Sequence, residues 1–153
     1  MVALHKNEYL YDSSIVCSPF YNPHKIFFPS KPFLLIDSDG KPLIEIPVSV
    51  NPVLPFPLGG AYGRIFGSRW LRVGIKMNFL IGAPVTLYIH PRDVSRKTRG
   101  YFWYTNINTT NSINIINNAL SYAKRMGAKF LKAQELAELF LKVKDSSRRV
   151  SIF

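Results

Sequence analysis

Cysteine and acidic residues are scarce in this sequence. Cys17 is the only thiol among 153 residues, which excludes an intramolecular disulfide framework. Asp and Glu total 9 against 20 Lys and Arg, so the formal net charge is +11. Such a balance favours anionic partners, whether nucleic acid, acidic lipid headgroups or an acidic protein, and it says nothing about the fold.

Long apolar runs are also missing. The longest stretch, residues 79–89, is interrupted by Gly82 and Pro84 and falls short of the ~20 residues of a membrane-spanning helix. We see no basic-then-apolar leader and expect no secretory signal. A hydrophobic content of 47% argues against disorder, and the length suits one domain or an incomplete larger one. We expect a cytoplasmic protein, with weak association at the anionic inner membrane surface as a further possibility.

Residue periodicity predicts alternating strands and helices. The first third reads as loop and strand, with a short apolar run at residues 32–36. Apolar alternation or β-branched residues predict strands at residues 43–50, 85–90 and 128–131. Helical patterns are found at residues 68–80, from a cap at Asn111 or Ser112 to Gly127, and from Ala133 onward. The first of the last two helices should bury Ile113, Ile116, Leu120 and Ala123. The second places Ala133, Leu136, Ala137 and Phe140 on one face. The alternation is typical of an α/β fold.

Few residues have the spacing that catalysis or metal binding requires. His5, His24 and His90 share no H-x-x-x-H spacing and have no completing acid, so we expect no metal site from this chain alone. Residues 59–63 are glycine-rich but lack the Lys-Ser/Thr of a phosphate loop, which favours a tight turn. His90 ends the clearest predicted strand. It is either a proton donor at a strand end or a histidine packed there with one hydrogen bond.

A series of motifs resembles the polysaccharide deacetylases, the NodB-homology domain of carbohydrate esterase family four. Tyr88-Ile89-His90-Pro91 resembles the histidine motif near the end of that domain. Further matches follow the family's order: YDSSI at residues 11–15, E-x-P-V-S at 45–49, GGxYxR at 59–64, and the closing strand and helix at 127–136. The resemblance covers nearly the whole chain, and it rests on the order and spacing of the motifs together.

The resemblance implies an incomplete domain. Residues 1–153 would form the C-terminal portion of a distorted (β/α) barrel of the NodB deacetylase type, with roughly its last three or four strands. The family's Asp-Asp pair, H-x-x-x-H metal site and Arg-x-Pro motif precede YDSSI and are not in this sequence. A divalent, zinc-like metal is therefore expected only in the complete domain, and the chain alone should be inactive. Its partner would be a complementary N-terminal half, unless the chain is a truncated product.

The same resemblance assigns roles to individual residues. His90 corresponds to the general acid that protonates the departing amine of an N-acetylated sugar, while the family's metal polarises the acetyl carbonyl. Tyr88 stands where many relatives have a Leu that lines the acetyl-methyl pocket. Tyr62 and Arg64 correspond to loop residues near the substrate groove. Glu45 matches its motif, and an ion pair with a core Arg or Lys is an equal alternative for it.

The competing interpretation is a non-catalytic basic module that binds polysaccharide or nucleic acid. Arg96, Lys97 and Arg99 precede the aromatic run at residues 101–104. Basic residues beside stacking aromatics are typical of nucleic-acid binding, and such rings also stack on sugars. A solvated loop leading into an aromatic strand explains them as well. We expect an N-acetylated polysaccharide or oligosaccharide as partner rather than nucleic acid.

Overall fold

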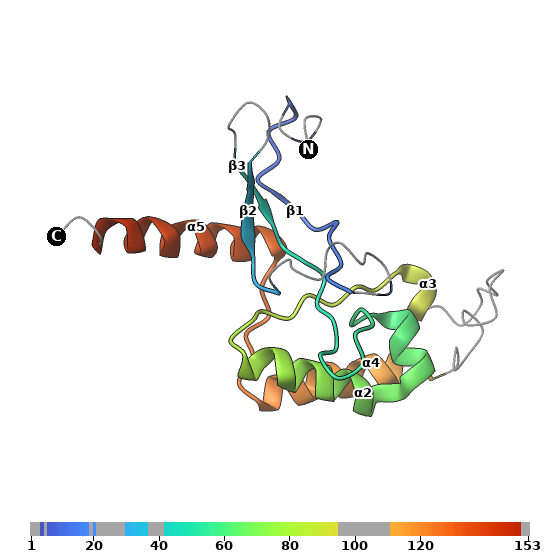
Figure 1. Cartoon of the computed structure of the whole chain (residues 1–153). Helices are drawn as coiled ribbons and strands as arrows, with labels where there is room; N and C mark the ends of the chain where they lie inside the picture. Colours follow the sequence, from blue (N-terminus) through green and yellow to red (C-terminus); the bar gives the residue numbers. More distant parts are fainter. Residues whose placement is uncertain are drawn as a thin grey trace.

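The structure is a computed structural model that describes residues 4, 6–18, 20, 30–36, 42–94 and 111–150, with side chains described as far as residue 143. Among these residues the elements are β1 (Tyr11–Asp12), β2 (Phe33–Ile36), β3 (Pro42–Glu45), α2 (Gly60–Leu80), α3 (Pro91–Val94), α4 (Ser112–Arg125) and α5 (Ala133–Val150). Figure 1 shows their arrangement. His5, His24 and the basic-aromatic segment 96–104 lie outside the described residues.

The strands form a small mixed sheet in the order β1-β3-β2. β3 pairs in parallel with β1 and antiparallel with β2, so that Ile44 lies opposite Tyr11 on one side and Leu34 on the other. The short apolar run at residues 32–36 contains β2. β3 ends at Glu45, however, and beyond Pro47, which has no N–H to donate, the predicted strand continues only as isolated bridges.

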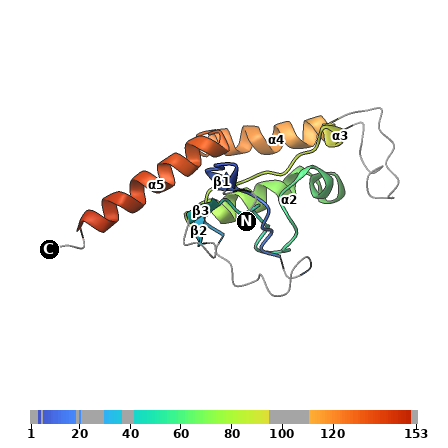
Figure 2. The same cartoon turned by 90° about the horizontal axis from the view of Figure 1, so that it is seen from above.

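Two helices lie side by side as a layer below the sheet (Figures 1 and 2). α2 begins at Gly60, well before the start predicted at Ser68, and kinks at Gly67, where φ is 82°. α4 begins after Asn111, as predicted. Their shared core contains Leu58, Leu71, Ile75, Ile115, Ala119 and Ala123. Ile113 is 42% exposed, so its predicted burial is wrong: the buried stripe passes through Ile115 and Ile116.

A second core joins α5 to the sheet. Ala137 is fully buried against Ile44 and Ile46, and Leu136 and Phe140 pack around them. This is the face predicted for the last helix, and α5 crosses beside the sheet before it extends away from the rest of the molecule (Figure 1). None of the helices in the described part of the chain has the length and apolar character needed to cross a membrane.

Two predicted strands are wrong. Residues 85–90, the clearest strand pattern in the sequence, make a single bridge, between Tyr88 and Gly59. Residues 128–131 form no strand either. Strand residues need neighbours on which to form a ladder, and within the described residues these segments have few or none. The described elements are helices and a three-stranded mixed sheet, and the barrel remains a prediction.

Candidate functional site

A cavity of about 670 Å³ gathers the motifs that are far apart in the sequence. Its walls include Ser13, Ser14, Val48, Tyr62, Tyr88 and His90. Ser13 and Ser14 belong to YDSSI, Val48 to E-x-P-V-S, Tyr62 to GGxYxR, and Tyr88 and His90 to YIHP. The fold therefore brings four of the five matched segments to one place. Arg92 and Asp93 of α3 complete the wall beside His90.

Backbone hydrogen bonds hold the histidine segment against the glycine segment. The Tyr88 N–H donates to the Leu58 carbonyl at 3.0 Å, and the Gly60 N–H donates to the Tyr88 carbonyl at 2.9 Å. A side chain on Gly59 would place its Cβ 2.5 Å from that Tyr88 oxygen, and a Cβ on Gly60 would lie 2.5 Å from the Asp93 carboxylate. Both glycines are therefore needed for close approach, and Gly60 begins a helix instead of a tight turn.

Asp93 holds the backbone of His90 through two hydrogen bonds. One carboxylate oxygen of Asp93 accepts the His90 backbone N–H at 2.9 Å, and the Asp93 N–H donates back to the His90 carbonyl at 2.8 Å. The other carboxylate oxygen accepts from the Arg64 guanidinium at 3.0 Å. Both charged side chains are only 2% exposed. Buried hydrogen bonds thus connect Arg64 of α2, through Asp93, to the backbone of His90, and they fix this backbone at the cavity wall.

The His90 ring itself is half-buried and packs against Tyr88. The two ring centroids lie 4.5 Å apart at an interplanar angle of 73°, an edge-to-face contact. Tyr88 is 51% exposed, so it can meet a ligand as well as the imidazole. This arrangement orients the histidine through both its backbone and its ring.

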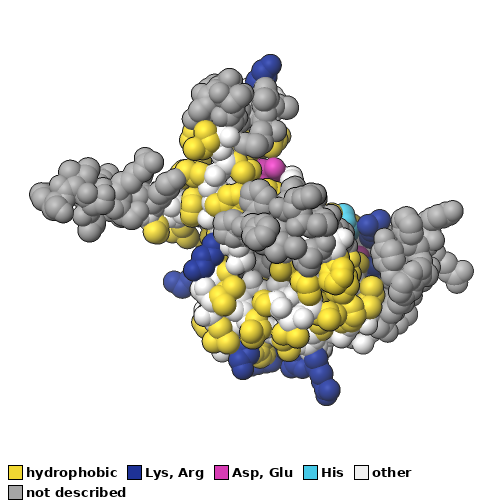
Figure 3. Space-filling view, in the orientation of Figure 1, with side chains coloured by type: hydrophobic (Ala, Val, Ile, Leu, Met, Phe, Trp, Pro, Cys, Tyr) yellow, Lys and Arg dark blue, Asp and Glu magenta, His cyan; other side chains and the backbone are white. Residues whose placement is uncertain are grey.

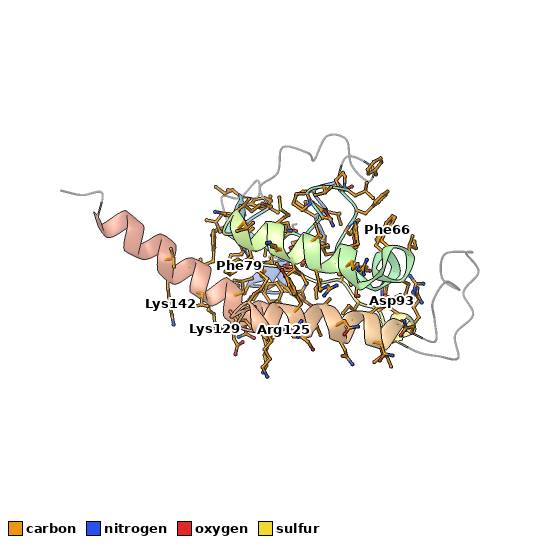
Figure 4. The ribbon with its side chains drawn as sticks, turned by 90° about the horizontal axis from the view of Figure 1, so that it is seen from below. Phe66, Phe79, Asp93, Arg125, Lys129 and Lys142 are labelled. Atoms are coloured by element: carbon orange, nitrogen blue, oxygen red, sulfur yellow. The ribbon has the colours of Figure 1, made fainter. Side chains whose placement is uncertain are left out.

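An aromatic cluster continues from the cavity along the outside of α2. Tyr62 lines the cavity and stacks on Phe56 at 5.0 Å, and Phe66 packs against Phe56 at 5.6 Å and Trp70 at 5.2 Å. Phe20, 65% exposed, also stacks on Phe56, at 4.8 Å. Figure 4 shows Phe66 near Asp93, at the end of α2 away from Phe79, and Figure 3 shows hydrophobic side chains over much of the face above α2.

A family model described as "Domain of unknown function (DUF3473)" matches residues 14–137. The chain belongs to this family. The matched range includes Tyr62, Tyr88, His90 and Asp93, so the cavity is built largely within the DUF3473 region. No curated protein and no solved structure matches the chain significantly.

The predicted site residues separate into two groups in this DUF3473 chain. Tyr62, Tyr88 and His90 all line the cavity. Arg64 does not line it, because its side chain points into the core and pairs with Asp93, so contact with a sugar, as the resemblance implied, does not fit its place in the structure. Glu45 is buried and accepts the Ile15 N–H at 2.8 Å.

Sequence reasoning missed Asp93 and the aromatic cluster. Asp93 stands three residues after His90, where a carboxylate can accept the backbone N–H at the start of a helical turn. Tyr62, Phe66 and Trp70 are spaced four residues apart, which is the spacing of one helix face. This spacing was not recognised as a helix face, because the helix was expected to begin only at Ser68.

The cavity does not supply a metal site by itself. The described residues contain no cluster of three or more His, Cys, Asp or Glu side chains that could hold an ion. Its wall offers the His90 imidazole and the Asp93 carboxylate, and the latter already binds Arg64 and the His90 backbone. The donor set therefore does not fit a divalent metal without ligands from another polypeptide.

Proposed function

We propose that this chain is the C-terminal part of a metal-dependent polysaccharide deacetylase, which hydrolyses the N-acetyl groups of amino sugars. The observation that carries the proposal is the cavity in which His90, Tyr88 and Tyr62 meet. The family offers independent support, because DUF3473 is associated with the C-terminal regions of polysaccharide deacetylases.

The chemistry that the proposal assigns to this chain is a proton transfer. Hydrolysis of an N-acetyl group joins a water oxygen to the acetyl carbon and breaks the carbon–nitrogen bond, which gives acetate and a free amine. An amine leaves poorly as an anion, so a proton must reach its nitrogen as the bond breaks. In this proposal the His90 imidazole, which lies at the cavity wall, supplies that proton.

The remaining chemistry is assigned to a complementary polypeptide. The proposal assigns the divalent, zinc-like metal and its ligands to that part, and the described residues of this chain include no cluster that could hold an ion. The chain alone is inactive under this proposal. Tyr62 and Tyr88 line the place where an N-acetylated polysaccharide or oligosaccharide would bind, and Arg64 acts through Asp93 as a positioning residue.

The decisive experiment reconstitutes the complete domain. This chain is mixed with a polypeptide that carries the Asp-Asp pair and the H-x-x-x-H site, a divalent ion and N-acetylated chitotetraose, and released acetate is measured. The proposal expects acetate only when both polypeptides are present. His90→Gln should lower kcat by about 10²–10⁴-fold, the usual contribution of a general acid.

A matched control separates chemistry from folding. Asn117→Ala changes an exposed polar side chain on α4, remote from the cavity lining, and should leave the rate unchanged. Circular dichroism and thermal melting establish that the His90→Gln chain is folded. Full activity in His90→Gln would show that the assigned acid is wrong.

A second candidate function is polysaccharide binding without hydrolysis. The aromatic cluster favours it, because rings at the surface beside a cavity stack on sugar rings, and Phe20 and Phe66 are 65% and 38% exposed. Titration of the lone chain with chitotetraose, followed by the fluorescence of its tryptophans, tests this role. Binding that is unaffected by His90→Gln, together with no acetate in the reconstituted mixture, would favour the binding module over the hydrolase.

A further inference from the structure

The two helices of the lower layer contain no acidic residue. Neither α2 nor α4 includes an Asp or a Glu, whereas both include basic residues: Arg64, Arg69, Arg72 and Lys76 in α2, and Lys124 and Arg125 in α4. Arg64 is neutralised in the core by Asp93. Arg69, Lys76 and Arg125 are exposed, and no ion pair is recorded for them among the described residues. The surface of this layer therefore carries an excess of positive charge.

The basic residues that follow the kink of α2 form one stripe. Arg69, Arg72 and Lys76 are spaced by three and four residues, which is the spacing of neighbours on one helix face. Val73 and Leu80 continue the same spacing and are 44% and 64% exposed. The buried residues of this part of the helix, Leu71, Gly74, Ile75 and Asn78, occupy its other side. The stripe is thus the face of α2 that is turned away from the core.

The second helix extends this face. The Arg72 guanidinium lies 5.8 Å from the centroid of the Tyr122 ring of α4, a cation–π contact that joins the two helices. Arg125 follows Tyr122 by three residues and so lies next to it on the surface of α4. Figure 3 shows Lys and Arg side chains that project from the lower edge of the molecule, where Figure 1 places α2 and α4. We call Arg69, Arg72, Val73, Lys76, Leu80 and Arg125 the outer helix face.

The outer helix face is separate from the candidate site. None of its residues lines the His90 cavity. It lies on the side of the helix layer opposite to the sheet (Figure 1). In a (β/α) barrel the helices surround the strands, so a complementary half would add strands to the sheet and leave this face in solvent. Its exposure therefore does not depend on whether the proposed barrel is complete.

We propose that the outer helix face lies flat on the surface of an anionic phospholipid bilayer. Its cations meet the lipid phosphates, while Val73 and Leu80 enter the boundary between headgroups and acyl chains. These apolar side chains favour a bilayer over nucleic acid, because a phosphate backbone offers them no apolar partner. The proposal goes beyond hydrolysis, and it holds whether or not His90 donates a proton.

Cosedimentation of the full chain with sucrose-loaded vesicles tests the proposal. The chain should bind vesicles of phosphatidylcholine mixed with phosphatidylglycerol at least tenfold more tightly than vesicles of phosphatidylcholine alone, and rising salt should weaken this binding. Arg69→Gln combined with Lys76→Gln should weaken it about 25-fold, since each cation at an anionic bilayer contributes about fivefold. The control combines Lys6→Gln with Lys142→Gln, which are exposed and outside the outer helix face, and should change binding less than about threefold.

A second pair of variants tests the apolar contribution. Val73→Gln combined with Leu80→Gln should weaken vesicle binding about tenfold. Leu139→Gln combined with Val143→Gln, at exposed positions of α5, should not. Circular dichroism and thermal melting establish that each variant is folded.

Three results would overturn the proposal. The first is equal binding of the unaltered chain to both kinds of vesicle, and the second is an equal loss in a test pair and its control pair. The third is binding of a DNA duplex that the Arg69→Gln and Lys76→Gln pair weakens, when the mixed vesicles are not bound, because this would assign the outer helix face to nucleic acid.

Discussion

Arg64 and Asp93 form a buried ion pair whose second function is to hold His90. The guanidinium lies 3.0 Å from one oxygen of the Asp93 carboxylate, while the other oxygen accepts the His90 backbone N–H at 2.9 Å. The GGxYxR and YIHP motifs are thereby joined through a residue that belongs to neither. The arginine of the first motif thus acts on the cavity from the core and not from the cavity surface.

Replacement of Arg64 by Met should strongly destabilise the fold. The substitution removes one member of a pair that is 2% exposed, and it leaves the Asp93 carboxylate buried without its cation. The expected loss in the free energy of unfolding is about 3–5 kcal/mol, measured by urea denaturation. Arg69→Met, at an exposed position on the same helix, should cost less than about 0.5 kcal/mol. Similar losses in the free energy of unfolding for the two variants would show that the ion pair does not account for the destabilisation.

Gly59 and Gly67 should respond differently to alanine. Gly59 has an extended backbone with φ of −157°, so alanine is penalised there only by the 2.5 Å approach of its Cβ to the Tyr88 oxygen. Gly67 has φ of 82° and ψ of 176°, a backbone conformation essentially restricted to glycine, and open space around it, so alanine costs only the backbone strain, about 1–3 kcal/mol. We expect Gly59→Ala to lower the melting temperature more. The opposite order would mean that segments 58–60 and 88–93 do not pack this closely in solution.

Asn78 should contribute to stability through two carbonyl groups. Its buried side-chain amide donates to the Val50 carbonyl at 2.9 Å and to the Gly74 carbonyl at 2.8 Å, which fastens α2 to the chain after β3. Asn78→Ala leaves the Val50 carbonyl without this donor and should cost about 1–3 kcal/mol in urea denaturation. Asn117→Ala, on the exposed side of α4, is the matched control. No difference between the two would contradict this role.

The local patterns predicted helices better than strands. The face of α5 follows from the spacing of Leu136, Ala137 and Phe140, and the start of α4 from Asn111, because helices are made of contacts within one segment. Residues 85–90 have the composition of a strand, yet a strand exists only with neighbours, and the described chain supplies one bridge. No pattern within a segment reveals whether the partner strand is present.

The residues that line the cavity were partly predicted from the sequence. The buried residues that hold them in place were not. The order of the motifs brought His90, Tyr88 and Tyr62 into one hypothesis, and the structure places them around one cavity. The inward direction of Arg64 depends on Asp93, 29 residues away, and on the absence of a Cβ at Gly60. Such a relationship is a property of packing between segments, so sequence spacing could not disclose it.

Tyr88 should matter for the rate through its contact with His90. Its ring packs edge-to-face on the imidazole at 4.5 Å, and Tyr88→Ala removes this support and lets the proton donor rotate. In the reconstituted deacetylase, kcat should fall about tenfold or more, since small displacements of a catalytic group are costly. Tyr88→Phe keeps the ring and should retain most of the rate. Tyr9→Ala, at a 59% exposed position outside this cavity, controls for the loss of a tyrosine. A Tyr88→Ala chain with an unchanged kcat would show that the ring contact does not orient His90.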